Sequence, residues 1–281
     1  MKLLIRAFCV TDAVGSVRWG LVALVLSFVS FLIALPEPAS AQTFAAAESA
    51  APKVFLIGNS LTWDTLPGLL SGDVDWHVDC GKSLQHIYDH PEKPCVPTSK
   101  NWPTALKHKK YDFLVVQPHY GSTLSQDVGV IERWLELQPE AILVIHTGWA
   151  RHVELEKLFQ ASDAAIVIDG NSKMVHSPKY FAAIEQQLHA RRPNLQIRST
   201  NAIQVLESIG EDIKNKRAPV QSLTELYRDD IHWTVQNGRY LAHNLMRRAL
   251  GQPRSTRGFQ LEPEMQTYLD AKLAQVPQTT K

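Results

Sequence analysis

The sequence has very little excess of charge of either sign. Its 29 lysine and arginine residues nearly balance 28 aspartate and glutamate residues, so the formal net charge is +1 over 281 positions. Proteins that bind nucleic acid or acidic lipid surfaces usually gather an excess of basic residues on one face. The composition therefore gives no reason to expect either kind of partner.

Long apolar runs are also rare, and the most prominent one lies near the start of the chain. Basic residues precede the uncharged run Trp19–Leu35, and the small residues Ala39 and Ala41 follow it. This order is typical of a secretory signal peptide. We expect residues 1–41 to be removed after Ala41, which makes the protein secreted or periplasmic with no membrane segment left. An uncleaved anchor is the alternative, because the run is nearly long enough to span a bilayer.

Cysteine is scarce, with three residues in the whole chain. Cys9 belongs to the expected signal peptide, so only Cys80 and Cys95 remain after cleavage. In an oxidising compartment we expect these two to form a disulfide, and closing so short a loop contributes about 3 kcal/mol in the chain-entropy picture. Two reduced thiols are the alternative, because spacing alone does not show that the side chains meet.

Internal repeats and long low-complexity linkers are missing from the sequence, so nothing in it suggests a second folded domain. The alanine-rich residues 42–52 are expected to form a flexible lead-in. Residues 53–281 are numerous enough to bury a core as one domain.

This part of the chain alternates apolar runs with helical patterns. We expect strands at Lys53–Gly58, Asp75–Asp79, Phe113–Gln117, Ala141–His146, Ala164–Ile168 and Gln196–Ser199. We expect helices at Pro103–Lys109, Val128–Leu137, Val153–Gln160, Lys179–Arg191, Ala202–Lys216, Val235–Leu250 and Met265–Val276. Strands separated by helices predict right-handed crossovers and a mostly parallel sheet. The predicted fold is a three-layer α/β domain.

The stretch KVFLIGNSLTW, residues 53–63, runs an apolar strand pattern directly into Gly58, Asn59 and Ser60. Such a run suits a strand that is covered on both faces. Open α/β sheets gather their ligands at the carboxyl ends of parallel strands. Ser60 is therefore a candidate functional residue, and the alternative is a serine that caps the next helix.

A serine hydroxyl becomes a good nucleophile when a histidine takes its proton and a carboxylate orients that histidine. His232 is the strongest of the eleven histidines, because Asp229 precedes it by three positions in YRDDIHWT. Across a turn, this spacing lets the carboxylate reach Nδ1 and leaves Nε2 free to face a hydroxyl. A polar pair that only pins a loop is the alternative interpretation.

These motifs resemble those of the SGNH or GDSL-type serine hydrolases. The Gly-Asp-Ser block of that family corresponds to Gly58, Asn59 and Ser60, with Asn59 in place of the usual aspartate. The family's Asp-x-x-His block corresponds to Asp229 and His232. The resemblance implies a flavodoxin-like α/β fold, with Ser60 as nucleophile, His232 as general base and then acid, and Asp229 as its orienter.

The resemblance is weaker in the two blocks that supply the oxyanion hole. Ser60 itself is one expected part of the oxyanion hole, and the second block of the family adds the N–H of a glycine. Gly81 in DCGKSL is similar to that glycine. The third block normally supplies an asparagine, but this chain has QPHY at residues 117–120. His119 takes the place of the asparagine, whereas Gln117 offers the more similar side-chain amide, so both are candidate donors. One such donor is typically worth about 3 kcal/mol to a tetrahedral intermediate.

Several residues near the expected strand ends could line a substrate cleft, where aromatic faces pack against sugar rings. The candidates are Asn59, Trp63, His146 and Trp149. Burial in the core is the alternative for the aromatic ones. His86 and His90 have the spacing of metal ligands on a helix, but no third ligand is evident, so we expect neither a metal nor another cofactor. Gly81 does not belong to a phosphate-binding loop, because the glycine required five places earlier is Trp76.

The resemblance implies a serine esterase that acts on a small-molecule or carbohydrate ester, with acetyl or another small acyl group as the acid component. The alternative is a carbohydrate- or envelope-binding protein that keeps this fold and has lost turnover, as the missing third-block asparagine would permit. The sequence indicates neither the natural substrate nor the oligomeric state.

Overall fold

The structure is a computed structural model that describes residues 51–160 and 175–276. The expected signal peptide, residues 42–50 of the expected lead-in and the predicted strand Ala164–Ile168 lie outside the described residues. In the two described ranges, no helix is long and apolar enough to cross a membrane.

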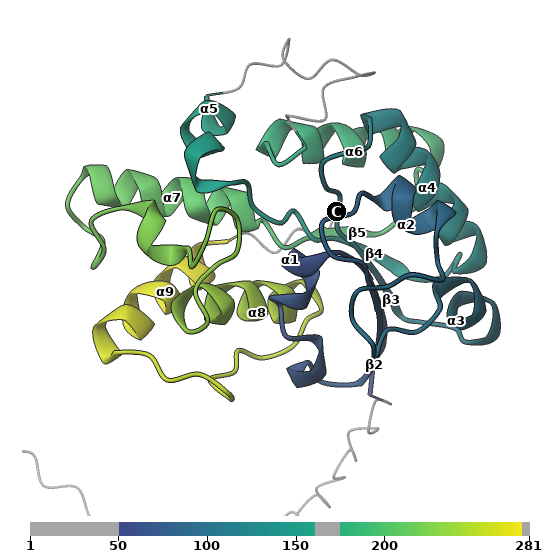
Figure 1. The fold of residues 1–281 in the computed structure, drawn as a ribbon, viewed down its shortest axis with the longest axis horizontal. Helices are drawn as coiled ribbons and strands as arrows, with labels where there is room; N and C mark the ends of the chain where they lie inside the picture. Colours follow the sequence, from purple (N-terminus) through teal and green to yellow (C-terminus); the bar gives the residue numbers. More distant parts are fainter. Residues whose placement is uncertain (1–50, 161–174, 277–281) are drawn as a thin grey trace, which may run out of the picture. The chain divides into compact units, whose positions relative to one another are not determined.

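The centre of the fold is a parallel sheet of five strands in the order β2-β1-β3-β4-β5 (Figure 1). The strands are β1 Lys53–Gly58, β2 Asp73–Val78, β3 Phe113–Val116, β4 Ile142–Ile145 and β5 Ile197–Ser199. Each of the four neighbouring pairs is parallel. This strand order is that of flavodoxin-like folds, so the predicted three-layer α/β fold is confirmed.

Helices connect the strands and cover both faces of the sheet. The α-helices are α1 Ser60–Trp63, α2 Leu84–Asp89, α3 Trp102–His108, α4 Leu124–Leu137, α5 Leu155–Phe159, α6 Pro178–Arg191, α7 Ala202–Lys214, α8 Asn237–Ala249 and α9 Pro263–Gln275. In the described residues, three 3-10 turns accompany them: η1 Pro67–Leu69, η2 His152–Glu154 and η5 Leu223–Leu226. In Figure 1, α2, α3, α4 and α6 lie on one side of the sheet, and α1 and α8 lie on the other.

The alternation of side chains along β1 builds the two layers of the core. Phe55 and Ile57 belong to the larger cluster, which contains the apolar faces of α4 and α6. Val54 and Leu56 belong to the smaller cluster, which is closed by Met246 and its neighbours at the end of α8. All four side chains are fully buried, as expected for a central parallel strand with both faces covered.

The direction of the crossovers reverses at β1. The chain moves from β1 to the edge strand β2, and then passes β1 again to reach β3. In such a sheet, the carboxyl ends of the two strands on either side of the reversal border a crevice where ligands bind. The residues that follow β1 and β3 therefore lie at the place where a site is expected.

The ends of several elements differ from the sequence prediction for local reasons. Helix α4 begins at Leu124, before the predicted start at Val128, because Thr123 and Gln126 form a capping box whose bonds satisfy both backbone N–H groups. The six-residue helix α2 was not among the predicted helices; the side chain of Ser83 caps it, and it ends just before Pro91.

Replacing either of two helical glycines by alanine should change the stability of the fold, in opposite directions. A Cβ at Gly238 would lie 2.4 Å from Cβ of Trp233, whereas a Cβ at Gly129 would meet nothing within 4 Å. Gly238→Ala should lower the free energy of unfolding by about 1–3 kcal/mol through overpacking. Gly129→Ala, the matched control, should raise it by up to about 1 kcal/mol through helix propensity. Urea denaturation measures both, and equal effects of the two changes would contradict the packing at Trp233.

Candidate active site

The turn from β1 into α1 is held by polar contacts of Asn59. Its Oδ1 accepts the N–H of Leu61 at 3.0 Å, which caps α1, and its Nδ2 donates to the carbonyl of Lys82 at 3.2 Å. A side chain at Gly58 would place Cβ 2.1 Å from Oγ1 of Thr62, so glycine is required there by close approach. Ser60 thus becomes the first residue of α1, at the carboxyl end of β1.

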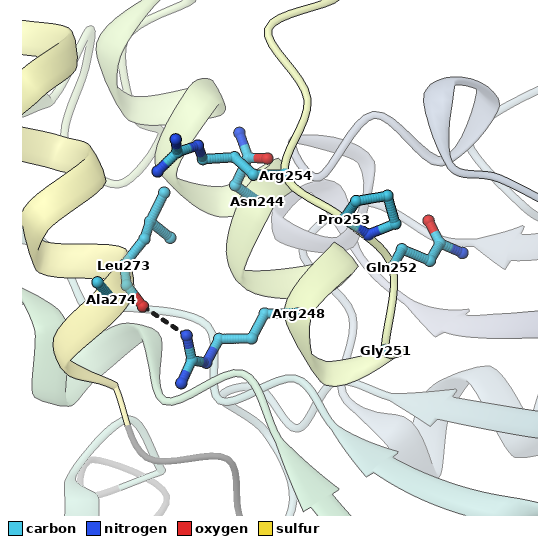
Figure 2. Close-up of a pocket in the computed structure, with 8 residues that line it drawn as sticks. All are labelled: Asn244, Arg248, Gly251, Gln252, Pro253, Arg254, Leu273 and Ala274. Carbon is cyan, nitrogen blue, oxygen red and sulfur yellow. Dashed lines mark hydrogen bonds between the residues drawn. The ribbon is translucent and has the colours of Figure 1, made fainter. Parts of the chain in front are cut away.

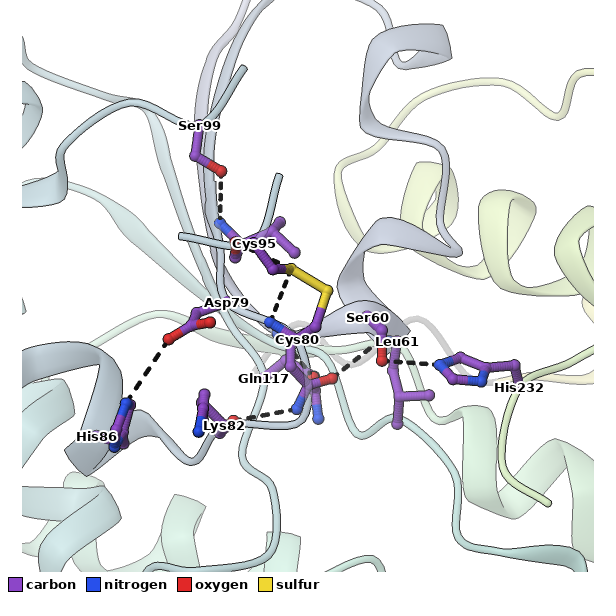
Figure 3. The surroundings of a disulfide bond; sticks show 12 residues. Ser60, Leu61, Asp79, Cys80, Lys82, His86, Cys95, Ser99, Gln117 and His232 are labelled. Carbon is purple, nitrogen blue, oxygen red and sulfur yellow. Dashed lines mark hydrogen bonds and ion pairs between the residues drawn. A yellow bond between two sulfur atoms is a disulfide. The ribbon is translucent and has the colours of Figure 1, made fainter. Parts of the chain in front are cut away.

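The structure brings Ser60, His232 and Asp229 into one chain of hydrogen bonds (Figure 3). Nε2 of His232 lies 2.9 Å from Oγ of Ser60, and Nδ1 lies 3.0 Å from both carboxylate oxygens of Asp229. An ionised carboxylate only accepts, so Nδ1 carries the proton and Nε2 of the neutral ring accepts from the serine hydroxyl. This is the protonation that a general base next to a nucleophile requires.

Asp229 is kept ionised by its own loop. Burial raises the pKa of Asp229, but this effect is outweighed by the N–H groups of His232 and Ile231 and by the His232 ring, so that the pKa falls to about 2. The two backbone bonds measure 2.8 and 3.0 Å. The carboxylate is half exposed, so it stays ionised because of its donors and not because it is shielded from water.

The loop that carries His232 is anchored by three residues that the sequence analysis did not select, Tyr227, Arg228 and Trp233, and by Trp149, which it assigned to a substrate cleft. Tyr227 and Trp233 form an isolated antiparallel bridge, and the N–H of Arg228 donates to the carbonyl of His232 at 2.9 Å. The indole of Trp149 stacks on Trp233 with ring centroids 3.9 Å apart, and its N–H donates to the carbonyl of Ile231 at 2.5 Å. These contacts join the segment after β4 to both sides of His232.

Two backbone N–H groups are available beside the serine. Within residues 51–160 and 175–276, neither the N–H of Ser60 nor that of Gly81 has a hydrogen-bond acceptor. Gly81 is exposed and has a positive φ of 69°, which glycine adopts without strain. Because Asn59 bonds the carbonyl of Lys82, the loop that contains Gly81 is tied to the turn that contains Ser60.

A disulfide holds the same loop from its other end. Cys80 and Cys95 are joined, with Cα atoms 5.6 Å apart, and the N–H of Cys95 donates to the carbonyl of Val78 at 3.1 Å. Figure 3 draws Ser60 and His232 among the residues around this bond. The disulfide therefore closes the segment that leads out of β2 and into Gly81.

The two residues considered as third oxyanion donors are both buried at the end of β3. The side-chain carbonyl of Gln117 accepts the N–H of Asn59 at 3.3 Å, and its amide donates to the carbonyl of Pro118, so this side chain braces the turn. Nδ1 of His119 lies 3.0 Å from Nε2 of His176. Burial, with smaller contributions from the charges of Arg151 and His232, lowers the pKa of His119 to about 4. His119 is therefore neutral, and its Nε2 has no partner in the described residues.

Three of the four residues proposed for a substrate cleft face the interior instead. Asn59, His146 and Trp149 have no exposed surface. Nε2 of His146 donates to the carbonyl of Leu61 at 3.4 Å, so this ring holds the backbone of α1 at the residue that follows the serine. The cleft prediction is wrong for these residues because their polar atoms are used to hold backbone. Trp63 is partly exposed, and its ring lies 5.8 Å from that of Trp76.

The described residues contain pockets away from the serine but no evident metal site. One pocket of about 530 Å³ lies between the end of α8 and α9 (Figure 2). There Arg248 donates to the carbonyls of Leu273 and Val276, so it caps α9 and does not offer its charge to a ligand. No group of three or more histidine, cysteine, aspartate or glutamate side chains within these ranges could hold a metal ion.

No protein-family profile matches the chain, and no curated protein matches it. Among solved structures, a DUF4886 family protein from Bacteroides uniformis ATCC 8492 is 18% identical over 79% of this chain and 93% of that chain, with a TM-score of 0.47. A two-domain esterase active on acetylated mannans is 13% identical over 81% of this chain and 52% of that chain, with a TM-score of 0.37. A protein described as a GDSL-like lipase from Parabacteroides merdae ATCC 43184 is 12% identical over 72% and 97%, with a TM-score of 0.41.

The lowered pKa of Asp229 predicts a specific pH dependence of stability. The ionised side chain stabilises the fold at pH values above about 4, and this contribution disappears as the pH falls towards about 2. The free energy of unfolding should therefore fall more steeply in the wild type than in Asp229→Asn between pH 5 and about 2.5. Asp230→Asn is the matched control, because the Asp230 side chain is more exposed and, among residues 51–160 and 175–276, is paired only with His152, at 3.6 Å. Equal slopes in all three proteins would contradict the hydrogen-bonded state of Asp229.

Proposed function

We propose that this protein is an exported serine esterase of the SGNH type, with Ser60, His232 and Asp229 as its catalytic triad. The observation that carries the proposal is the continuous chain of hydrogen bonds from the Ser60 hydroxyl through His232 to Asp229. The unpartnered N–H groups of Ser60 and Gly81 support it, because acyl transfer needs donors for the developing oxyanion. Ester hydrolysis is a reaction that this set of groups can carry out without a cofactor.

In the acylation step, Oγ of Ser60 attacks the ester carbonyl carbon while Nε2 of His232 takes its proton. The carbonyl oxygen becomes an oxyanion that accepts from the N–H groups of Ser60 and Gly81, with His119 as the third candidate donor. Asp229 stabilises the imidazolium through the Nδ1 proton. The tetrahedral intermediate then expels the alkoxide, which takes the proton from Nε2 and leaves as an alcohol, so that Ser60 carries the acyl group.

In the deacylation step, a water molecule loses its proton to Nε2 of His232 and attacks the acyl carbon of the ester on Ser60. The second intermediate collapses by breaking the bond to Oγ, and the proton returns from His232 to Ser60. The products are a carboxylic acid and the free enzyme. Each proton therefore moves only between His232 and an oxygen at hydrogen-bond distance.

The substrate is proposed to be a small-molecule or carbohydrate ester that carries acetyl or another small acyl group. This part of the proposal depends on the resemblance of the motifs, since neither Leu61 nor Thr62 beside the serine is exposed to select an acyl chain. The expected signal peptide would place the reaction in the periplasm or outside the cell.

Ser60→Ala should abolish both reaction with a fluorophosphonate probe and hydrolysis of aryl acetates, by a factor on the order of 10³ or more. Ser71→Ala is the matched control, because Ser71 precedes β2 at the opposite end of the strands, and its hydrogen bonds in the described residues go to Arg247 and Gln252. It should react like the wild type. Undiminished hydrolysis by Ser60→Ala would rule out Ser60 as the nucleophile. A wild type that neither labels nor hydrolyses would favour the binding-protein alternative.

Hydrolysis should also depend on the protonation of His232. As the pH falls and the ring becomes protonated, the rate should decline, because a protonated ring cannot accept the proton of Ser60. His232→Ala should lose most of the activity, and the activity that remains should not show this decline with pH. Initial rates of aryl acetate hydrolysis between pH 5 and 8 measure the profile. A flat wild-type profile would exclude His232 as the general base.

A further inference from the structure

The helix that carries Ser60 is very short, and its far end is tied to the rest of the molecule by charge. Helix α1 is four residues long and is followed by Asp64, whose side chain is 1% exposed. Oδ1 of Asp64 accepts from the guanidinium of Arg228 at 3.1 Å and from that of Arg239 at 2.8 Å. Within the described residues Oδ2 has no partner, so one oxygen receives both arginines.

The two arginines come from different elements and reach different places. Arg239 belongs to α8, and in the described residues its guanidinium bonds only Asp64. Arg228 belongs to the loop of His232: its guanidinium also donates to the carbonyl of Trp233, and its Nε lies 3.9 Å from Oδ2 of Asp229. Its backbone N–H donates to the carbonyl of His232. Arg228 therefore contacts both the end of α1 and the residues on either side of His232.

We infer that Asp64 and Arg228 are positioning residues that hold Ser60 at hydrogen-bond distance from His232, an inference that rests on the proposed function. Neither side chain bonds the Ser60 hydroxyl or the His232 ring. A helix of one turn has too few internal bonds to keep its own orientation, and a displacement of about 1 Å between reacting groups can reduce a rate by roughly 100-fold. The Asp64–Arg228 pair is the direct ionic link between the two segments.

The alternative is that this cluster only stabilises the fold, as buried ion pairs are often assumed to do. The two explanations make different predictions for the two arginines. Each arginine bonds the same oxygen of Asp64, so the loss of either one removes a comparable ionic bond. Only Arg228 connects that oxygen to the His232 loop. A purely stabilising role predicts that the loss of activity follows the loss of stability in each variant, whereas a positioning role predicts a loss of activity in the Arg228 variant beyond what its loss of stability explains.

The experiment compares Arg228→Gln with Arg239→Gln as its matched control, in the full-length exported protein. The readout is the rate constant at which Ser60 reacts with a fluorophosphonate probe, which requires no knowledge of the natural substrate. Arg228→Gln should react about 100-fold more slowly than the wild type, and Arg239→Gln within about 5-fold of it. Thermal unfolding should show a loss of stability in both variants, somewhat larger for Arg228→Gln because it also loses the bond to the Trp233 carbonyl.

Two further variants keep the inference falsifiable if Arg228→Gln does not fold. Arg228→Lys retains the charge but cannot bond Asp64 and the Trp233 carbonyl in the same geometry, so it should also react slowly. In the double variant Asp64→Asn/Arg228→Gln, the rate should be no lower than in Arg228→Gln alone, because both changes break one link. Asp64→Asn by itself should also react slowly, because it weakens the same link to Arg228.

Several outcomes would overturn the inference. They are a wild-type rate in Arg228→Gln or Arg228→Lys, equal losses in the Arg228 and Arg239 variants, and fully additive losses in the double variant. If the probe labels Ser60 in the wild type and Arg228→Gln reacts at the same rate, the positioning role alone is refuted. A wild type that the probe does not label at Ser60 would refute the proposed function and the positioning role with it.

Discussion

The hydrogen bond between Ser60 and His232 connects residues 172 positions apart in the chain, and much of the structure is arranged so that these two atoms meet at 2.9 Å. The parallel sheet places Ser60 at the carboxyl end of β1, the strand at which the crossovers reverse. The His232 loop, which follows β5, α7 and η5 in the chain, reaches the same place. If β1 paired with its two neighbouring strands in another register, the turn at Asn59 and the loop at Asp229 would no longer meet.

Around this bond, buried polar side chains do the work of holding backbone. Asn59, Gln117 and His146 bond the turn of the serine, and Trp149 bonds the loop of the histidine. Such groups are costly to bury unless they find partners, and here most of the partners are backbone groups of these two segments or of the segments next to them. The proposed chemistry therefore depends on buried residues that hold the two segments in place.

The sequence predicts the parts of this site that are local. Asp229 and His232 are three residues apart, and Ser60 ends an apolar strand, so short-range pattern is enough to propose them. The five described strands were all predicted within about two residues of their observed ends. The strand predicted at Ala164–Ile168 lies outside the described residues. The start of α4 was missed, since its signal is a capping box at Thr123 and not an apolar repeat.

Other features could not be predicted, because their partners are far apart in the chain. Asp64 and Arg228 are separated by 164 positions, and no local spacing marks them as a pair. His146 and Trp149 have the composition of cleft residues, but the sequence does not show that their polar atoms are needed by Leu61 and Ile231. The choice between core and cleft depends on tertiary contacts, which a single sequence does not contain.

The two aspartates of the site differ in their access to water. Asp229 is half exposed, whereas Asp64 is almost completely covered. Dissolved ions screen a charge that they can approach, with a Debye length of about 8 Å at physiological ionic strength, and they screen covered pairs much less. Salt therefore screens the electrostatic support that His232 receives more strongly than the ionic bonds of Asp64, whose two arginine partners are only 30% and 22% exposed. When the salt concentration rises, the electrostatic stabilisation of His232 should therefore weaken before the position of the serine helix changes.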